Sequence, residues 1–295
     1  VLDFSTLLPG PMATLMLAEA GAEVIKIERP GRGEDMRGYA PYWGADSVNF
    51  ALLNRGKKSL TLDLKNPADR AKLDPLIARA DAVVEQFRPG VMERLGLDYE
   101  ALSKKNPRII YCAISGFGYS DPARTPRGAY DHVIQALTGM TMLAGSEGDP
   151  PVKTGFPVVD AATGIIGALA IVIALRERDH TGAGCFLDVS MWASALQLMY
   201  PFACETLASG QEIARIGNKG YSGSPAADTF PCRDGWLAIG ANTPEHIGRL
   251  MDLLGVAPAE VASLLEIPSA SGAAFARARD PQAFRELLAA RLAEQ

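Results

Sequence analysis

Short apolar segments alternate with helical patterns along the first part of the chain. The short segments are rich in Val, Ile and Leu and are bounded by polar or glycine residues, as buried strands are. They occupy residues 1–5, 23–28, 59–64, 81–87 and 108–115. Helical patterns fill the intervals at 12–22, 66–80, 89–96 and 98–106. This alternation predicts a largely parallel sheet with helices on both faces, which binds ligands beyond the carboxyl ends of its strands.

Longer apolar patterns follow. Helices are predicted over 131–144, over 161–175 and from Trp192 onward, with a strand at 185–191. The segment 161–175 is apolar on every side, which indicates a buried helix. The longer segment 155–175 is nearly long enough to cross a bilayer, but Pro157, Asp160, its three glycines and the lack of an aromatic anchor at its far end argue against a membrane span.

The pattern changes near residue 200, which suggests two domains. Residues 1–200 are predicted to form a large, Rossmann-like α/β domain, and residues 201–295 a linker and a smaller α+β domain. In the smaller domain, 217–228 reads as a glycine-rich loop and 235–241 as a strand, and the chain is mostly helical from Pro244 onward.

Composition narrows the class of protein. Hydrophobic residues make up 48% and charged residues 21% of the chain, as in globular domains with a sizeable core. The net charge of −5 argues against a nucleic-acid partner. Residues 1–110 carry 16 Lys and Arg against 15 Asp and Glu, whereas the remainder carries 13 against 19. A small anionic ligand is therefore expected in the first part.

The four cysteines lie far apart without C-x-x-C spacing, so neither a metal site nor a disulfide framework is predicted. Together with the lack of a secretory signal, this favours a cytoplasmic protein. Because the chain begins inside a predicted strand, an organellar location after removal of a targeting peptide stays open.

The segment from Gly155 to Leu175 contains a single acid, Asp160, and two interpretations of it are open. Asp is a preferred N-cap, and in that role it would stabilise the helix by about 1 kcal/mol. A carboxylate that the helix start holds ionised, in a position poor in water, would also be a stronger nucleophile than one in bulk water. Ala161, Ala162 and Gly164 would then leave space for an electrophile.

Basic residues border several predicted strands, where they would meet the phosphates of a ligand or remain solvated surface charges. They are Arg29, Lys57, Lys58, Lys65, Arg88 and Arg94. The first strand-to-helix turn, LLPGP, lacks the G-x-G-x-x-G fingerprint, which counts against a dehydrogenase. The three histidines have no partner at the spacing of a nucleophile motif or a metal site.

Six segments together resemble family III CoA-transferases, the group that contains formyl-CoA transferase, carnitine CoA-transferase and the α-methylacyl-CoA racemases. The segments are 10–37, 54–67, 83–118, 130–140, 155–164 (GFPVVDAATG) and 181–191. The resemblance implies a Rossmann-like large domain, a smaller domain and a C-terminal segment that returns to the large one. It also implies that two ring-shaped subunits interlock as a homodimer. The return segment is not recognisable before Gln295.

By this resemblance Asp160 is the catalytic residue. Its carboxylate would attack an acyl-CoA thioester to form a mixed anhydride, and the CoA thiolate would then form an aspartyl-CoA thioester. Candidate donors to the oxyanions are the N–H groups of the helix start and those near Gly220 and Gly223. The resemblance places coenzyme A against Leu7, Leu8, Arg29, Leu62, Lys65, Gln86, Phe87, Arg94 and Leu95. Gln86 stands where the family commonly has Asn.

The expected substrates are an acyl-CoA and a small carboxylic acid. Arg37 and Arg127 are candidates to face a second carboxylate, which would suit a dicarboxylate such as succinate. Tyr130, also expected at the binding site, is typical of the transferases, whereas the racemases have His there. His132 lies two positions later, about 200° around the helix axis from Tyr130, and is therefore a poor substitute for that histidine. CoA transfer is thus favoured, and a racemase-like epimerase is the alternative. A CoA-binding protein without turnover would require loss of the acid, which is present.

Overall fold

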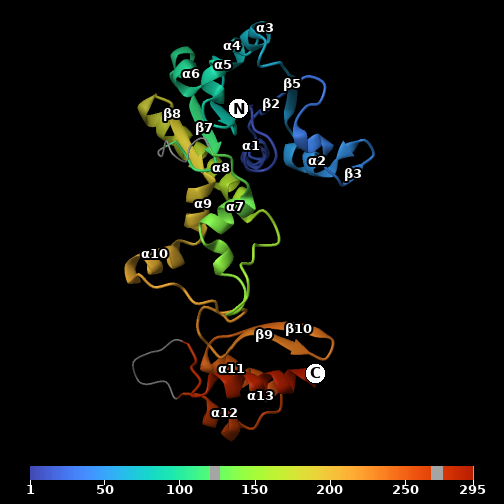
Figure 1. Ribbon diagram of the computed structural model, residues 1–295, viewed down its shortest axis with the longest axis vertical. Coiled ribbons are helices and arrows are strands. Elements are labelled where there is room, and N and C mark those ends of the chain that lie inside the picture. The colour runs from blue at the N-terminus through green and yellow to red at the C-terminus, as the bar shows by residue number, and fades with distance from the viewer. Residues whose placement is uncertain (120–126, 267–274, 295) are drawn as a thin grey trace. The chain divides into compact units, whose positions relative to one another are not determined.

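The computed structural model describes residues 1–119, 127–266 and 275–294 (Figure 1). The chain divides into two compact units. The first consists of Val1–Met142 and Pro151–Ile213, and the second of Leu143–Pro150 and Ala214–Gln295. The domain boundary expected at residue 200 falls at the start of a helix inside the first unit.

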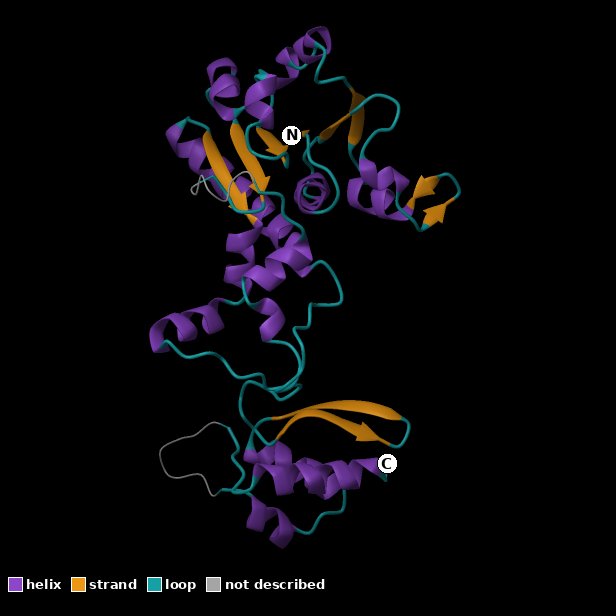
Figure 2. Ribbon diagram, viewed as in Figure 1, coloured by secondary structure: helices purple, strands orange, loops and turns teal. Residues whose placement is uncertain are grey.

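A six-stranded sheet forms the centre of the first unit, and each neighbouring pair in it is parallel (Figure 2). In spatial order the strands are β5 (Lys58–Thr61), β2 (Ile25–Glu28), β1 (Leu2–Asp3), β6 (Ala82–Glu85), β7 (Ile110–Ser115) and β8 (Cys185–Ser190). All six correspond to predicted strands, so the parallel α/β fold is confirmed. The chain runs from β1 to one edge and then from β6 to the other, which puts the switch point between β1 and β6.

Ten α-helices belong to the described part of this unit. They are α1 (Pro9–Glu19), α2 (Val48–Asn54), α3 (Pro67–Ala71), α4 (Asp74–Ile77), α5 (Val91–Leu95), α6 (Tyr99–Lys105), α7 (Asp131–Leu137), α8 (Val158–Thr181), α9 (Met191–Leu198) and α10 (Tyr200–Ser209). Two 3₁₀ helices, η1 (Asp35–Gly38) and η2 (Met140–Met142), and a small hairpin of β3 (Tyr42–Trp43) and β4 (Asp46–Ser47) complete the unit.

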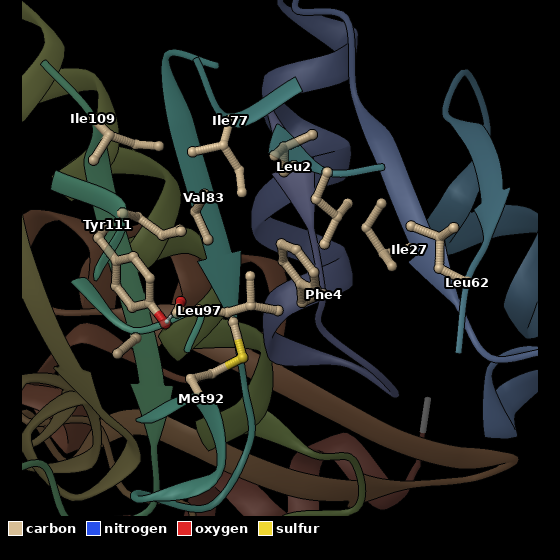
Figure 3. Close-up of a cluster of buried hydrophobic side chains, with 13 residues drawn as sticks. Leu2, Phe4, Ile27, Leu62, Ile77, Val83, Met92, Leu97, Ile109 and Tyr111 are labelled. Carbon is tan, nitrogen blue, oxygen red and sulfur yellow. Dashed lines mark hydrogen bonds between the residues drawn. The ribbon is translucent and has the colours of Figure 1, made fainter. Parts of the chain in front are cut away.

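Side chains alternate between the two faces of the sheet, as the pleat requires. Val83 and Tyr111 face one side, where they join the apolar cluster shown in Figure 3 with residues of α4, α5 and α6. Val84 and Cys112 face the other side, where they pack with α1 and α8. Both faces are thus buried, which explains why the strands read as continuous apolar runs.

Three predicted helices differ from those in the structure. The segment 66–80 forms two short helices, α3 and α4, because Pro75 cannot donate a hydrogen bond to a continuing helix. The segment 131–144 ends as α7 at Leu137 and continues as η2 beyond Gly139, whose φ is 81°. The segment 161–175 is the centre of the longer α8.

The second unit is an α+β fold, as expected. Its strands β9 (Ala226–Cys232) and β10 (Gly235–Ala241) are antiparallel, and its helices are α11 (Pro244–Leu253), α12 (Pro258–Leu264) and α13 (Pro281–Ala293). Phe230, Ile247, Phe284 and Leu288 are fully buried in its core. The sequence pattern missed β9, because its segment AADTFPC lacks a long β-branched run.

Among the described residues, α8 is the one helix whose length and composition would allow it to cross a membrane. In the structure it packs against α1, β7 and β8 in the centre of the first unit.

Candidate active site

Asp160 lies in the first turn of α8 but does not cap it. The helix begins two residues earlier, at Val158, and its N-cap position is Pro157, which makes no capping hydrogen bond with its side chain. The interpretation of Asp160 as the N-cap is therefore wrong. The carboxylate of Asp160 makes no hydrogen bond or ion pair with any residue in the described part of the chain.

The cap comes instead from α7. Asp131 accepts hydrogen bonds through Oδ2 from the backbone N–H groups of Val159, at 2.8 Å, and of Asp160, at 3.0 Å. Its other oxygen, Oδ1, contacts the Nε2 of Gln135. These bonds satisfy donors at the start of α8 that would otherwise lack a partner. The sequence could not indicate this cap, because its donor groups lie 28 and 29 residues away from Asp131.

The electrostatic environment of Asp160 also differs from the expectation that the helix start holds it ionised. Burial and, to a smaller extent, the negative charge of Asp131 together raise the pKa of Asp160 to about 7. The N–H groups that would favour the ionised form are bonded to Asp131. At neutral pH the group is therefore divided between its acid and its nucleophilic carboxylate form.

Gly164 serves the packing of α8 rather than the space beside Asp160. A Cβ at this position would lie 2.7 Å from the carbonyl oxygen of Pro9 and 2.9 Å from the Cβ of Met12. The glycine therefore allows the backbones of α8 and α1 to approach closely. The prediction that it leaves room for an electrophile has no support in this geometry.

A cavity of about 390 Å³ lies at the carboxyl ends of β2, β5 and β6. Six of the residues expected to contact coenzyme A line it: Arg29, Leu62, Lys65, Phe87, Arg94 and Leu95. The sequence analysis did not single out the other lining residues, which are Phe4, Thr6, Ile27, Glu28, Gly33, Glu34, Asp63, Leu64 and Val91. Most of them are next in sequence to predicted contact residues or to the ends of predicted strands. Their closeness to those strand ends is the sequence signal that could have identified them.

The cavity combines apolar walls with cationic groups. Arg29 contacts Asp35 and donates through Nε to the carbonyl of Gly33, at 2.8 Å. Lys65 and Arg94 make no ion pair with any residue that the structure describes. Such a cavity suits a ligand with an aromatic or apolar part and several phosphates.

The remaining expected contacts lie outside the lining of this cavity. Leu8 occupies the N-cap position of α1, and Gln86 accepts a hydrogen bond from the N–H of Gly10, at 2.9 Å, so it helps to hold the start of that helix. Arg127 is exposed. Tyr130 is 69% exposed and stacks on His132, with ring centroids 6.1 Å apart.

Leu7 has an unusual backbone. Its φ of 62° is costly for a residue with a Cβ, and its N–H donates to Oε1 of the buried Glu34, at 2.7 Å. Lys26, also buried, lies 3.1 Å from Oε2 of Glu34 and 3.7 Å from Asp3. This buried network fixes the turn between β1 and α1, beside the cavity.

Lys57, which was considered as a cation at the ligand rim, belongs to the same network. Its Nζ lies 3.1 Å from Asp3 and donates to Thr14 at 2.7 Å, with the side chain buried. Burial lowers its pKa to about 8. Because its donors are used inside the fold, it is not a ligand contact.

Arg37, proposed to face a second carboxylate, is engaged elsewhere. Its Nε and Nη2 donate to the two oxygens of Glu28, at 2.7 Å each, and its guanidinium lies 3.7 Å from the centroid of the Phe50 ring. Burial favours the neutral form of Glu28, but the hydrogen bonds from Arg37 and Ser59 lower its pKa to about 2. The pair is thus a fixed part of the fold.

Gly220 and Gly223 belong to the second unit, and their N–H groups already have acceptors. Gly220 donates to the carbonyl of Ala227, at 2.6 Å, and Gly223 donates to the carbonyl of Gly220, at 3.1 Å. Neither N–H is available as an oxyanion donor in this conformation. Within the described ranges, no group of three or more His, Cys, Asp or Glu has the geometry of a metal site.

The sequence and the fold were compared with those of known proteins. A sequence model of CoA-transferase family III matches residues 1–295. The chain is 41% identical over 258 residues to acetyl-CoA:oxalate CoA-transferase of Acetobacter aceti, covering 86% of this chain and 65% of that protein. It is 35% identical over 257 residues to succinyl-CoA:glutarate CoA-transferase of Mus musculus, covering 87% of this chain and 58% of that protein.

The fold is similar to that of a CaiB/BaiF family protein from Brucella suis. That structure has a TM-score of 0.85 and 32% sequence identity, and the match covers 100% of this chain and 77% of the other. The chain thus spans only 58–65% of the length of these two curated relatives.

Proposed function

The chain belongs to CoA-transferase family III, and on that basis we propose that it transfers CoA from an acyl-CoA thioester to a small carboxylic acid. One observation carries the proposal: Asp160 presents a carboxylate without a hydrogen-bond partner among the described residues, in the first turn of α8. Because α8 leads into the parallel strand β8, its first turn lies toward the carboxyl edge of the sheet, as the cavity does.

We propose that Asp160 is the catalytic nucleophile. Its carboxylate oxygen forms a bond to the thioester carbon, the C–S bond breaks, and the electron pair leaves on the CoA sulfur. The thiolate then attacks the aspartyl carbonyl of the mixed anhydride and releases the first acid as its carboxylate. An incoming carboxylate attacks the aspartyl thioester and expels the CoA thiolate, which leaves a second mixed anhydride. The thiolate then attacks the carbonyl of the new acyl group, and Asp160 leaves as its carboxylate.

The cavity next to β2, β5 and β6 is the proposed site for the nucleotide part of CoA. Leu62, Phe87 and Leu95 supply apolar walls, while Lys65 and Arg94 supply cations for phosphates.

We propose a dicarboxylic acid as the acceptor. The support is the similarity to relatives named for glutarate and oxalate. Arg127 is exposed and remains a candidate for the second carboxylate, whereas the ion pair of Arg37 with Glu28 removes Arg37 from this role.

Racemisation is not favoured. The position that would need a catalytic histidine is Tyr130, and the imidazole of His132 stacks on the exposed Tyr130 ring. Asp131, which would have to orient that histidine, is used as the cap of α8.

We further propose that the protein is a cytoplasmic homodimer. Ile165, Leu169, Val172 and Ile173 form an apolar face along α8 and are 45–59% exposed, although they belong to an otherwise buried helix. A second copy of the chain would cover this face. The four cysteines are free, as in proteins of a reducing compartment.

Replacing Asp160 by Ala tests the proposed chemistry. Exchange of CoA between a donor thioester and a dicarboxylate should fall by at least about a thousandfold, because nucleophilic catalysis has no substitute in the site. CoA should still bind, because the cavity residues are unchanged. Near-normal exchange by Asp160→Ala would exclude the aspartyl mechanism.

A further inference from the structure

Two acids meet at the start of α8: Asp160 lies in its first turn, and Asp131 contacts that turn from α7. The proposed chemistry uses only Asp160. Asp131 accepts three contacts, from the N–H groups of Val159 and Asp160 and from the side chain of Gln135. All three contacts use Asp131 as an acceptor, as expected of a carboxylate. Asp160 therefore faces the negative charge of a second carboxylate, which raises its pKa.

Asp131 is held rigidly. Gln135 is fully buried, donates through Nε2 to Oγ1 of Thr154, at 2.9 Å, and accepts from the N–H of Thr154, also at 2.9 Å. Thr154 in turn donates to the carbonyl of Phe156, at 2.8 Å. These bonds tie the loop before α8 to α7, so neither acid can move away from the other without breaking them.

Burial and Asp131 raise the pKa of Asp160, and no cation among the described residues offsets them. The strands packed on α8 carry Tyr111 and Cys112 on β7, and Cys185 and Asp188 on β8, and none of these is a cation. α1 carries one acid, Glu19, at its far end, and α9 has no charged side chain. On α7 the remaining titratable side chain is His132, which stacks on Tyr130. Lys153, in the loop before α8, donates to the carbonyl of Thr154.

We propose that Asp131 is a positioning residue with two effects: it caps α8 in place of Asp160, and its charge drives Asp160 toward its acylated state. This inference rests on the proposed function, and it follows from the charges of Asp160 before and after acylation. Attack on the thioester turns the charged Asp160 carboxylate into a neutral acyl derivative, and the negative charge departs on the CoA sulfur. Acylation therefore relieves the repulsion between the two acids, so the charge of Asp131 favours both intermediates over the resting enzyme.

The variant Asp131→Asn separates the charge from the cap, since Asn keeps one oxygen for the N–H groups of Val159 and Asp160. Without the charge of Asp131 the pKa of Asp160 falls, so the acidic limb of the plot of kcat/KM against pH should move about one pH unit lower. At pH 8, the single-turnover rate of acylation by a donor thioester should fall about tenfold, which is the equivalent of that shift. The KM for the donor should change little, because the cavity residues are unchanged.

The matched control is Gln135→Met, which removes a hydrogen-bond donor from Asp131 but leaves its charge. It should lower the rate while the acid limb stays in place. Two results would show that Asp131 is only a structural cap and that the inference is wrong. Either both variants shift the acidic limb of the kcat/KM profile equally, or Asp131→Asn changes neither that limb nor the acylation rate.

A measurement on the unmodified chain keeps the inference testable should Asp131→Asn not fold. With ¹³C-labelled aspartate and Asp160→Asn for assignment, the carboxyl of Asp160 should titrate near pH 7. Titration near pH 4 would overturn the inference. Failure of the proposed function is distinguishable, because then the unmodified enzyme itself would form no aspartyl intermediate.

Discussion

Asp160 combines its proposed function with a cost in stability, because its charged form is buried beside a second acid. In the unfolded chain its pKa is near 4, whereas in the fold it is raised to about 7. Between these values the folded state binds more protons than the unfolded state, so this group lowers stability progressively as the pH rises. Below pH 4 the cost disappears, since the group is protonated in both states.

Asp160→Asn should therefore stabilise the protein in a pH-dependent manner. At pH 8 the free energy of unfolding should rise by roughly 2 kcal/mol, after allowance for partial solvent screening. At pH 4 the variant and the unmodified chain should have nearly equal stability. Urea unfolding at both pH values measures the difference. An equal gain at both would show that Asp160 carries no raised pKa.

At the same scale, several residues that line the cavity could be predicted from sequence and several could not. Arg29 and Lys65 follow strands, and Arg94 lies in α5, the short helix after β6, so their place at the cavity follows from the alternation of strands and helices. Lys57 satisfies the same pattern yet lies in a buried ion network. Lys57 turns inward and its neighbour Lys58 stays exposed. The difference depends on acids such as Asp3, more than 50 residues from Lys57 in sequence, and a local pattern carries no such information.

At the scale of elements, α8 is positioned by its contact with α1. Both helices cover the same face of the sheet, and small residues let them approach closely. The apolar pattern predicted the existence of α8 but not its first residue, Val158, since the helix follows Pro157 and its first N–H groups are capped by Asp131 of α7. Pro75 in the sequence indicates that a single helix over 66–80 would be interrupted. The apolar residues continue on both sides of it, and for that reason the pattern predicted one helix in place of α3 and α4.

A pair of glycines on α8 tests this packing. Gly164→Ala should destabilise the fold by about 1–3 kcal/mol, because its Cβ would lie 2.7 Å from the backbone oxygen of Pro9. Gly167→Ala is the matched control, since its Cβ would lie 3.6 Å from its nearest neighbours. The control should be neutral or more stable by up to about 1 kcal/mol, from helix propensity. Thermal unfolding that ranks the two variants in the opposite order would contradict the packing.

At the scale of the whole molecule, the parallel order of the sheet and the α+β second unit followed from the periodicity of the sequence. The switch point between β1 and β6, which places the cavity, depends on strand order, and local periodicity does not encode that order. The apolar face of α8 was likewise not evident, because a helix apolar on every side gives no sign of which side stays exposed.

This face provides a test of the proposed homodimer. Leu169→Lys combined with Ile173→Lys should convert a dimer into a monomer, because two buried charges would have no partner in the interface. Light scattering after size-exclusion chromatography measures the mass. Leu253→Lys, a change at an exposed leucine in the second unit, should leave the dimer intact. A dimer that persists in the double variant would place the interface elsewhere.

The central claim, that Asp160 becomes covalently acylated, is tested most directly by trapping. The protein is incubated with a donor thioester such as succinyl-CoA, treated with hydroxylamine and digested, and the peptide that contains Asp160 is analysed by mass spectrometry. The account predicts a hydroxamate on Asp160 that forms only when the donor is present. An enzyme that exchanges CoA at its full rate while Asp160 stays unmodified would contradict it.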